Sequence, residues 1–173
     1  MSISPERKAL IVSVCFTGIG VVAWHYQVTD WQAALPLAIF YVTLLCNTFF
    51  SIKLFTSITP SSHLQNTMDA LLVFTYLGVA WNLGNPLLFV FFALLLFIVA
   101  PAKYAFLLNI TEHPHLMKRK IIVDLSGTLA CALTLGALVL GYSEVSAWGL
   151  AIIFVIANIY LFFVRPLYRL DSA

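Results

Sequence analysis

Six long apolar runs follow one another along this chain, separated only by short polar stretches. Each run has about 19 to 25 residues, and an α-helix rises about 1.5 Å per residue, so each run can cross the roughly 30 Å hydrocarbon core of a bilayer. The runs lack the alternating pattern of membrane β-strands and are too long for them. The sequence therefore predicts an all-α, polytopic membrane protein with six transmembrane helices.

Composition agrees with this fold class. The 173 residues are 62 % hydrophobic and only 9 % charged, whereas soluble domains carry about 25 % charged residues. We expect one domain, residues 1–173, in which short turns pair the helices into three antiparallel hairpins. The predicted spans are residues 8–26, 31–55, 64–83, 86–108, 119–141 and 145–168.

The basic residues indicate an orientation. With six spans, all nine Lys and Arg residues fall on one side of the membrane or at its edge, and the opposite loops carry only Asp30 and Glu144. The positive-inside rule then places both termini in the cytoplasm. We expect an integral protein of the bacterial inner (plasma) membrane. The nine basic residues are Arg7, Lys8, Lys53, Lys103, Lys118, Arg119, Lys120, Arg165 and Arg169.

Acids and bases stand at matching places in the predicted hairpins. Asp69 lies just inside one end of the third span and Lys103 just inside the end of the fourth, so a hairpin brings them to the same side. Asp124 and Arg165 repeat the plan in the last hairpin, and Lys53 ends the first. A carboxylate inside a membrane is costly unless it is paired or solvated. We predict that these five residues form a charge belt facing the bundle interior on the cytoplasmic side.

Two interpretations of this belt stay open. It is either a set of structural ion pairs that fixes helix register, or a site for a proton, an ion or an anionic lipid head group. The excess of bases over acids favours an anion or a lipid phosphate.

Other residues within the spans suggest packing. Asn47, Asn82 and Asn158 can form hydrogen bonds between helices or line a polar pathway. The small residues of Gly18-Ile19-Gly20 and Ser126-Gly127, with Ala130, allow close helix approach. The fourth span is almost wholly apolar over residues 87–100. That pattern favours a helix that faces lipid or a partner over a pore wall.

No catalytic or cofactor motif is present: the sequence lacks HExxH, GxSxG and a glycine-rich phosphate loop. We therefore expect a protein that is not an enzyme and has neither a cofactor nor a metal site. Nucleic-acid binding is disfavoured, because no basic stripe with interleaved aromatic residues occurs.

Three function classes remain. The first is a small transport or channel protein for an ion, an anion or a small solute. The second is a non-enzymatic accessory, scaffold or lipid-sensing subunit of a larger membrane complex; a lipid-modifying enzyme is a weaker third. Expected partners are membrane lipid and either further copies of the chain or another membrane subunit. A water-accessible cavity lined by Asp69, Asp124 or Asn47 would favour transport, and a closed bundle with a flat apolar face would favour the accessory role.

Overall fold

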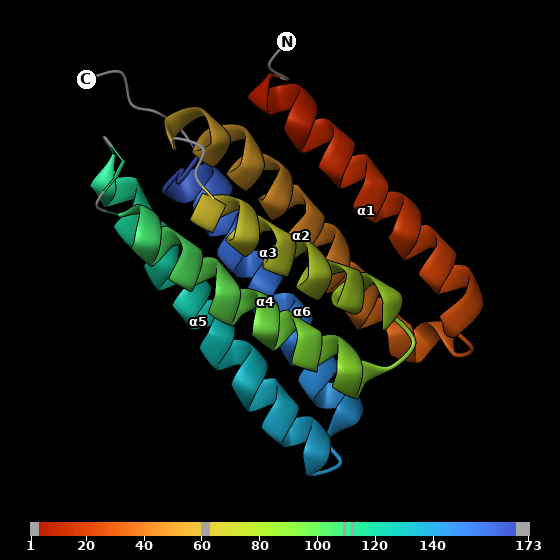
Figure 1. The fold of residues 1–173 in the computed structure, drawn as a ribbon. Coiled ribbons are helices and arrows are strands. Elements are labelled where there is room, and N and C mark those ends of the chain that lie inside the picture. The colour runs from red at the N-terminus through yellow and green to blue at the C-terminus, as the bar shows by residue number, and fades with distance from the viewer. Residues whose placement is uncertain (1–3, 60–62, 109, 112, 169–173) are drawn as a thin grey trace.

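A computed structural model describes residues 4–59, 63–108, 110–111 and 113–168 of the chain. Within these residues all regular structure is helical, and six α-helices lead into a short π-helix (Figure 1). Their bounds are α1 Pro5–Gln27, α2 Trp31–Ile58, α3 His63–Trp81, α4 Pro86–Leu107, α5 Pro114–Val139, α6 Ser143–Ile159 and η1 Tyr160–Val164.

Five helical segments are long and apolar enough to cross a membrane: α1, α2, α4, α5 and the unit formed by α6 with η1. This is compatible with an integral membrane protein. The sixth helix, α3, does not reach that level of apolar character, because its first turns carry polar residues that include Gln65, Asn66 and Asp69. The six predicted spans thus correspond to six helices, of which five have the character of membrane spans.

Local capping explains where several helices begin. Ser4 accepts a hydrogen bond from the backbone N–H of Arg7 at the start of α1. Asp30 caps α2 and Asn85 caps α4 in the same manner, since a side-chain oxygen satisfies N–H groups that lack a helical partner. After α5, Gly141 takes a φ of 91°, a left-handed conformation that favours glycine and ends the helix.

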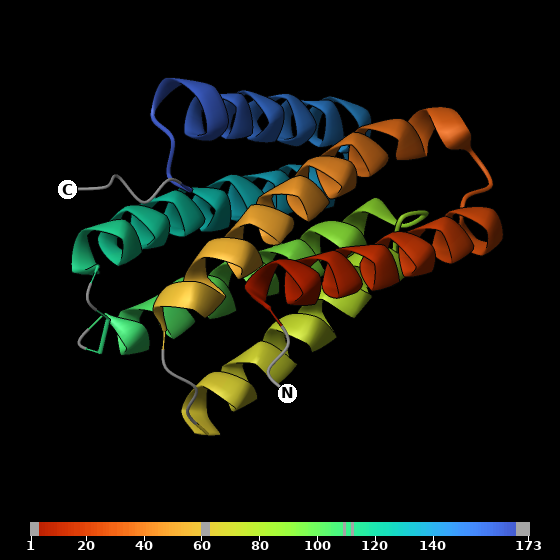
Figure 2. The same cartoon turned by 90° about the horizontal axis from the view of Figure 1, so that it is seen from above.

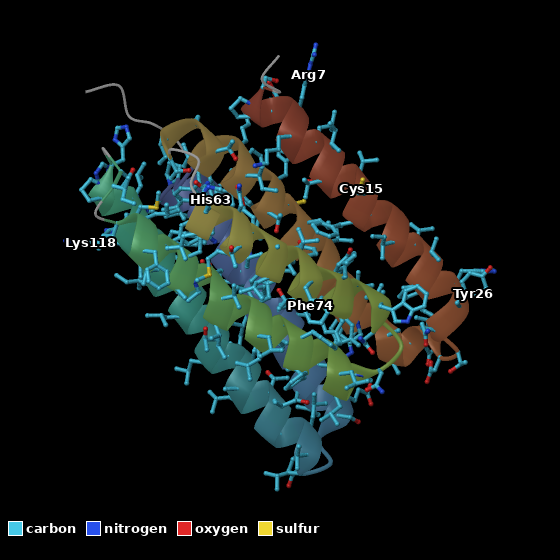
Figure 3. The ribbon with its side chains drawn as sticks, viewed as in Figure 1. Arg7, Cys15, Tyr26, His63, Phe74 and Lys118 are labelled. Carbon is cyan, nitrogen blue, oxygen red and sulfur yellow. The ribbon has the colours of Figure 1, made fainter. Side chains whose placement is uncertain are left out.

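The helices form two layers of three. In one layer α2 packs between α1 and α6, and in the other α4 packs between α3 and α5 (Figures 1 and 2). Contacts of α1 with α3 and of α5 with α6 close the two sides, whereas α2 and α4 touch only sparsely across the middle. We call the end of the bundle that holds Arg7, His63 and Lys118 the polar end, and the end near Tyr26 the far end (Figure 3).

An aromatic cluster fills the space between the layers away from the polar end. The ring of Phe40 on α2 stacks on Phe154 of α6, with ring centroids 4.3 Å apart, and meets Phe89 and Phe97 of α4 edge-on. All four rings are buried. On α5, Gly127 lets the backbone lie against the Phe97 ring, since an added Cβ would come within 2.7 Å of it.

Helix α4 differs from its predicted role. We expected its apolar stretch to face lipid or a partner, and one face with Phe91 and Ile98 is exposed. The opposite face is not: the helix occupies the centre of its layer, and Phe89, Val90 and Ala93 are fully buried. The physical reason is that a protein interior and a lipid tail are both apolar, so hydropathy alone does not tell a helix facing one from a helix facing the other.

Candidate functional site

A cavity of about 350 Å³ lies between the two layers, bounded by residues of α1 to α5. Its wall includes the exposed residues Lys8, Asn66 and Val73, so the cavity opens to the surface there. Buried Leu44, Tyr76 and Phe97 close the inner side. The polar residues of the wall are Lys8, Asn47, Thr48, Ser51, Thr56, Gln65, Asn66, Asp69, Tyr76, Lys103, Tyr104, Lys120 and Asp124.

The cavity reaches deep into the bundle. Along α2 its wall extends from Thr56 to Leu44, a distance of about 18 Å at 1.5 Å per residue. This is roughly half of the ~30 Å thickness of a bilayer core. Polar side chains of the wall therefore extend well along helices that are long and apolar enough to cross a membrane.

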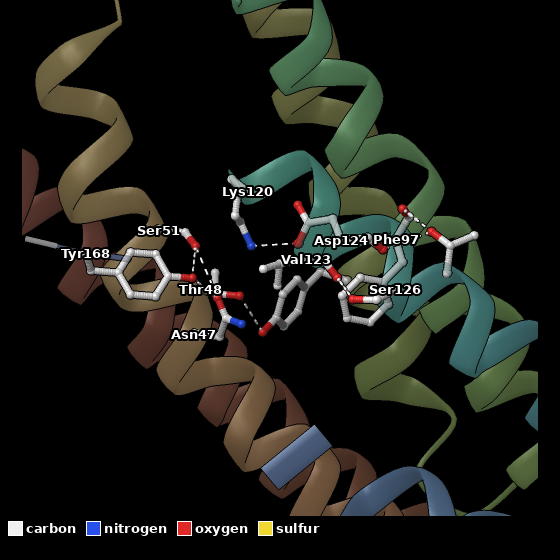
Figure 4. A network of polar contacts seen from close by, with 11 residues as sticks. Asn47, Thr48, Ser51, Phe97, Lys120, Val123, Asp124, Ser126 and Tyr168 are labelled. Carbon is white, nitrogen blue, oxygen red and sulfur yellow. Dashed lines mark hydrogen bonds and ion pairs between the residues drawn. The ribbon is translucent and has the colours of Figure 1, made fainter. Parts of the chain in front are cut away.

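One ion pair in the wall is almost completely buried. Lys120 Nζ lies 2.7 Å from Asp124 Oδ1, one helical turn further along α5, and the side chains are 6 % and 1 % exposed (Figure 4). The second carboxylate oxygen, Asp124 Oδ2, is buried and has no hydrogen-bond partner among the described residues. Thr128 donates to the backbone carbonyls of Asp124 and Phe97, which ties this part of α5 to α4.

A second ion pair joins α3 to α4. Lys103 Nζ lies 2.5 Å from Asp69 Oδ1, and the side chains are 12 % and 35 % exposed. Both residues line the same cavity as Lys120 and Asp124. The ring of Tyr104 connects the two pairs, because its centroid is 5.9 Å from Lys103 Nζ and 5.8 Å from Lys120 Nζ.

A hydrogen-bonded group of neutral residues continues the wall on α2. The hydroxyl of Tyr168 donates to Asn47 Oδ1, which also accepts from Ser51 at 3.2 Å (Figure 4). Tyr168 comes from the segment after η1, where the π-helical turn bends the chain back and leaves Leu167 fully buried.

The structure brings four of the eight predicted residues to the cavity: Asn47, Asp69, Lys103 and Asp124. The other four are not among the described residues of its wall. Lys53 pairs with Glu6 at 2.9 Å on an exposed surface. The backbone carbonyl of Arg165 accepts a hydrogen bond from Arg119.

The other two asparagines that we predicted, Asn82 and Asn158, form hydrogen bonds with residues of the same or the directly preceding helix. Asn82 donates to the carbonyl of Gly78 at the end of α3, and Asn158 donates to the carbonyl of Phe154 on α6. Asn158 lines a smaller cavity of about 90 Å³ between α2, α4, α5 and α6. Asn47 borders both cavities, so it lies in the partition between them.

Lys120 is the main residue that sequence reasoning missed. We counted it only among the nine basic residues on one side of the membrane, yet it is buried within α5, where Leu116 and Met117 precede it as buried residues. The signal was present, because residues four apart on a helix face each other and Lys120 stands four before Asp124. Tyr104 and Tyr168 carried no comparable signal, since their roles depend on contacts between distant helices.

Among the residues that the structure describes, no three His, Cys, Asp or Glu side chains gather as a metal ion would require. Comparison of the chain with models of protein families, with curated proteins and with solved structures gives no match. The function must therefore be inferred from the cavity and its residues.

Proposed function

We propose that this protein carries a small solute across a membrane and that the cavity is its binding chamber. One observation carries the proposal: a deep cavity, open to the surface and bounded inside by aromatic residues, has two Lys–Asp ion pairs in its wall. Its volume of about 350 Å³ falls in the range of small-molecule sites, about 300–1,000 Å³.

The cavity favours transport over the accessory role. A docking subunit needs an apolar outer face and a closed interior, which apolar side chains provide at the lowest cost. Here the interior holds Lys120 and Asp124, and ionisable groups at membrane depth are costly and mark substrate or ion paths more often than lipid contacts.

A topology follows as part of the proposal. All six helices cross the membrane, with the polar end and both termini in the cytoplasm of a bacterium, as the distribution of Lys and Arg favours. The polar residues of α3 support a crossing for this helix, because Gln65, Asn66 and Asp69 line the cavity rather than requiring lipid contact. In this arrangement the cavity opens towards the cytoplasm.

Transport also requires a second state that is open at the far end. In the present state the aromatic cluster of Phe40, Phe89, Phe97 and Phe154 closes that path. The backbones of α2 and α4 approach each other only sparsely, so opening this path requires the ring of Phe40 to separate from those of Phe89 and Phe97. Rocking of one half of a bundle against the other around a central site is a common route to alternating access.

The test is solute flux in proteoliposomes made with the purified full chain. Small anions, cations, zwitterions and neutral solutes are offered separately, and uptake of at least one class is expected above that of protein-free vesicles. The double variant Lys120→Gln/Asp124→Asn should lose this uptake, because it removes the buried charges without leaving one unpaired. Glu6→Gln is the matched control, since it disrupts only the exposed pair with Lys53.

A second measurement tests access to the cavity. With Cys15, Cys46 and Cys131 replaced by Ala, a cysteine placed at Ser51 should react with a membrane-impermeant maleimide from one side only. Absence of flux for every solute class, together with no labelling at position 51, would overturn the transport proposal. Co-purification of a second membrane subunit of fixed stoichiometry with an inactive lone chain would favour the accessory role instead.

A further inference from the structure

We infer that the ligand of the cavity is a small zwitterion, a molecule that carries an ammonium group and an oxyanion a few bonds apart, as an α-amino acid does. The inference rests on the proposed function and names the substrate class of the same site. It follows from the balance of charges in the wall, from one unpaired carboxylate oxygen and from the apolar remainder of the surface.

The charges inside the cavity balance. The two positive charges of Lys103 and Lys120 equal in number the two negative charges of Asp69 and Asp124. The third base of the wall, Lys8, lies exposed at the rim. An ion of one sign would bring an uncompensated charge into a region of low dielectric constant, which is costly. A zwitterion brings none, so it can exchange with the existing ion pairs without changing the net charge of the cavity.

The buried pair offers the complementary groups. Asp124 Oδ2 is buried and has no partner among the described residues. A ligand ammonium group would supply the missing hydrogen bond once the Asp124 side chain turns towards the cavity that it borders. Lys120 has three donors; Asp124 accepts from one and the Tyr168 hydroxyl engages another, which leaves one for a ligand. A ligand with both charges can therefore bind Asp124 through its ammonium group and Lys120 through its oxyanion.

The rest of the inner wall is apolar and aromatic. Phe16, Leu44 and Leu96 line it together with the rings of Tyr76 and Phe97. These surfaces suit the side chain of an apolar amino acid, because burying apolar area there needs no further hydrogen-bond partner. L-leucine and L-phenylalanine are therefore the first probes.

The experiment measures binding of matched probes to the purified full chain in detergent. L-phenylalanine is compared with 3-phenylpropionate, which lacks the ammonium group, and with phenethylamine, which lacks the carboxylate. L-leucine is compared with 4-methylpentanoate and 3-methylbutylamine. We expect at least one of the two amino acids to bind at least about tenfold more tightly than both of its singly charged relatives, since each relative leaves a buried charge unmatched.

A lipid head group can present the same chemistry. Glycerophosphoethanolamine therefore joins the panel, because it carries an ammonium group and a phosphate without acyl chains. If it binds and the amino acids do not, the zwitterion class stands and its source is a lipid. Failure of all three zwitterions to bind, or equal binding of a singly charged relative, overturns the inference.

Variants give an independent check. Lys120→Gln/Asp124→Asn should weaken binding of the preferred zwitterion at least about tenfold, whereas Glu6→Gln should leave it unchanged. Unchanged affinity in a folded double variant overturns the assignment; if that variant does not fold, the probe comparison on the unaltered protein decides.

The two proposals fail differently. If an ion of one sign binds and crosses the membrane while zwitterions do not, the transport function stands and the zwitterion class is wrong. If no solute of any charge class binds or crosses, both are wrong.

Discussion

The polar end and the far end of the bundle, which we call its polar half and its sealed half, are built from the same helices. They differ in the side chains that those helices place between the two layers. Along α2, the buried stripe consists of large apolar residues from Leu37 to Leu44 and then changes at Asn47 and Ser51 to small polar ones. The first part packs into the aromatic cluster, and the second borders the cavity. A change at a few inward positions therefore separates a packed aromatic core from a polar cavity wall, although both ends of the bundle are strongly apolar overall.

The largest expected effect on stability comes from the sealed half. Phe40→Ala removes a buried ring that contacts three other buried rings, and the expected loss is about 3–5 kcal/mol. Unfolding in mixed detergent and SDS measures it. Phe91→Ala is the control, because Phe91 is 42 % exposed and its removal should cost far less. Equal losses would mean that the aromatic cluster is not the main packing centre.

The buried ion pair should rank next. Asp124→Asn leaves the Lys120 ammonium buried without its counter-charge, and we expect a loss of about 3 kcal/mol, near the lower end for a broken buried pair because Lys120 still borders the cavity. Asp69→Asn should cost less, since Asp69 is 35 % exposed. The same unfolding assay compares the two variants. A larger loss of stability for Asp69→Asn would contradict the expectation that the more deeply buried pair contributes more.

Close packing at the border of the two halves gives a smaller effect. Gly127→Ala places a Cβ within 2.7 Å of the Phe97 ring, which the neighbouring rings hold in place, so a loss of about 1–3 kcal/mol is expected. Gly136→Ala on the same helix meets nothing within 4 Å and should gain a few tenths to about 1 kcal/mol. Similar shifts of the unfolding midpoint in the two variants would contradict this contact.

The smallest effect should come from the polar half. Tyr168→Phe removes the hydroxyl that donates to Asn47 but keeps the ring against Phe50 and Phe162. We expect a loss of about 1 kcal/mol, because Asn47 still accepts a hydrogen bond from Ser51. A loss as large as that of Phe40→Ala would show that the segment after η1 anchors the whole fold.

Much of the helical layout was accessible from the sequence, because apolar runs of membrane length and turn residues such as Asn85-Pro86 are local signals. The contact of Asp69 with Lys103 follows from pairing two consecutive helices through a short turn. The central place of α4 was not accessible, since hydropathy treats lipid and protein interior alike. The cavity was not accessible either, because it depends on which faces of five helices meet.

The candidate site shows the same limit in finer detail. Lys120 and Asp124 are one turn apart, so their pairing was a local signal that we did not use. Lys53 was expected beside the acids of later helices, yet Glu6 lies closer across α1 and α2. The function of the predicted residues remains a prediction that flux and binding have to decide.

The wide turn of η1 has a consequence for the length of the chain. The N–H of Arg165 bonds to the carbonyl of Tyr160, five residues back, so this turn takes up one residue more than an α-turn would. Deleting a single residue between positions 160 and 164 would therefore close this wide turn to an α-turn and leave the direction of the following chain nearly unchanged. The burial of Leu167 should survive such a deletion, so η1 gives the spacing between α6 and the C-terminal segment a tolerance of one residue.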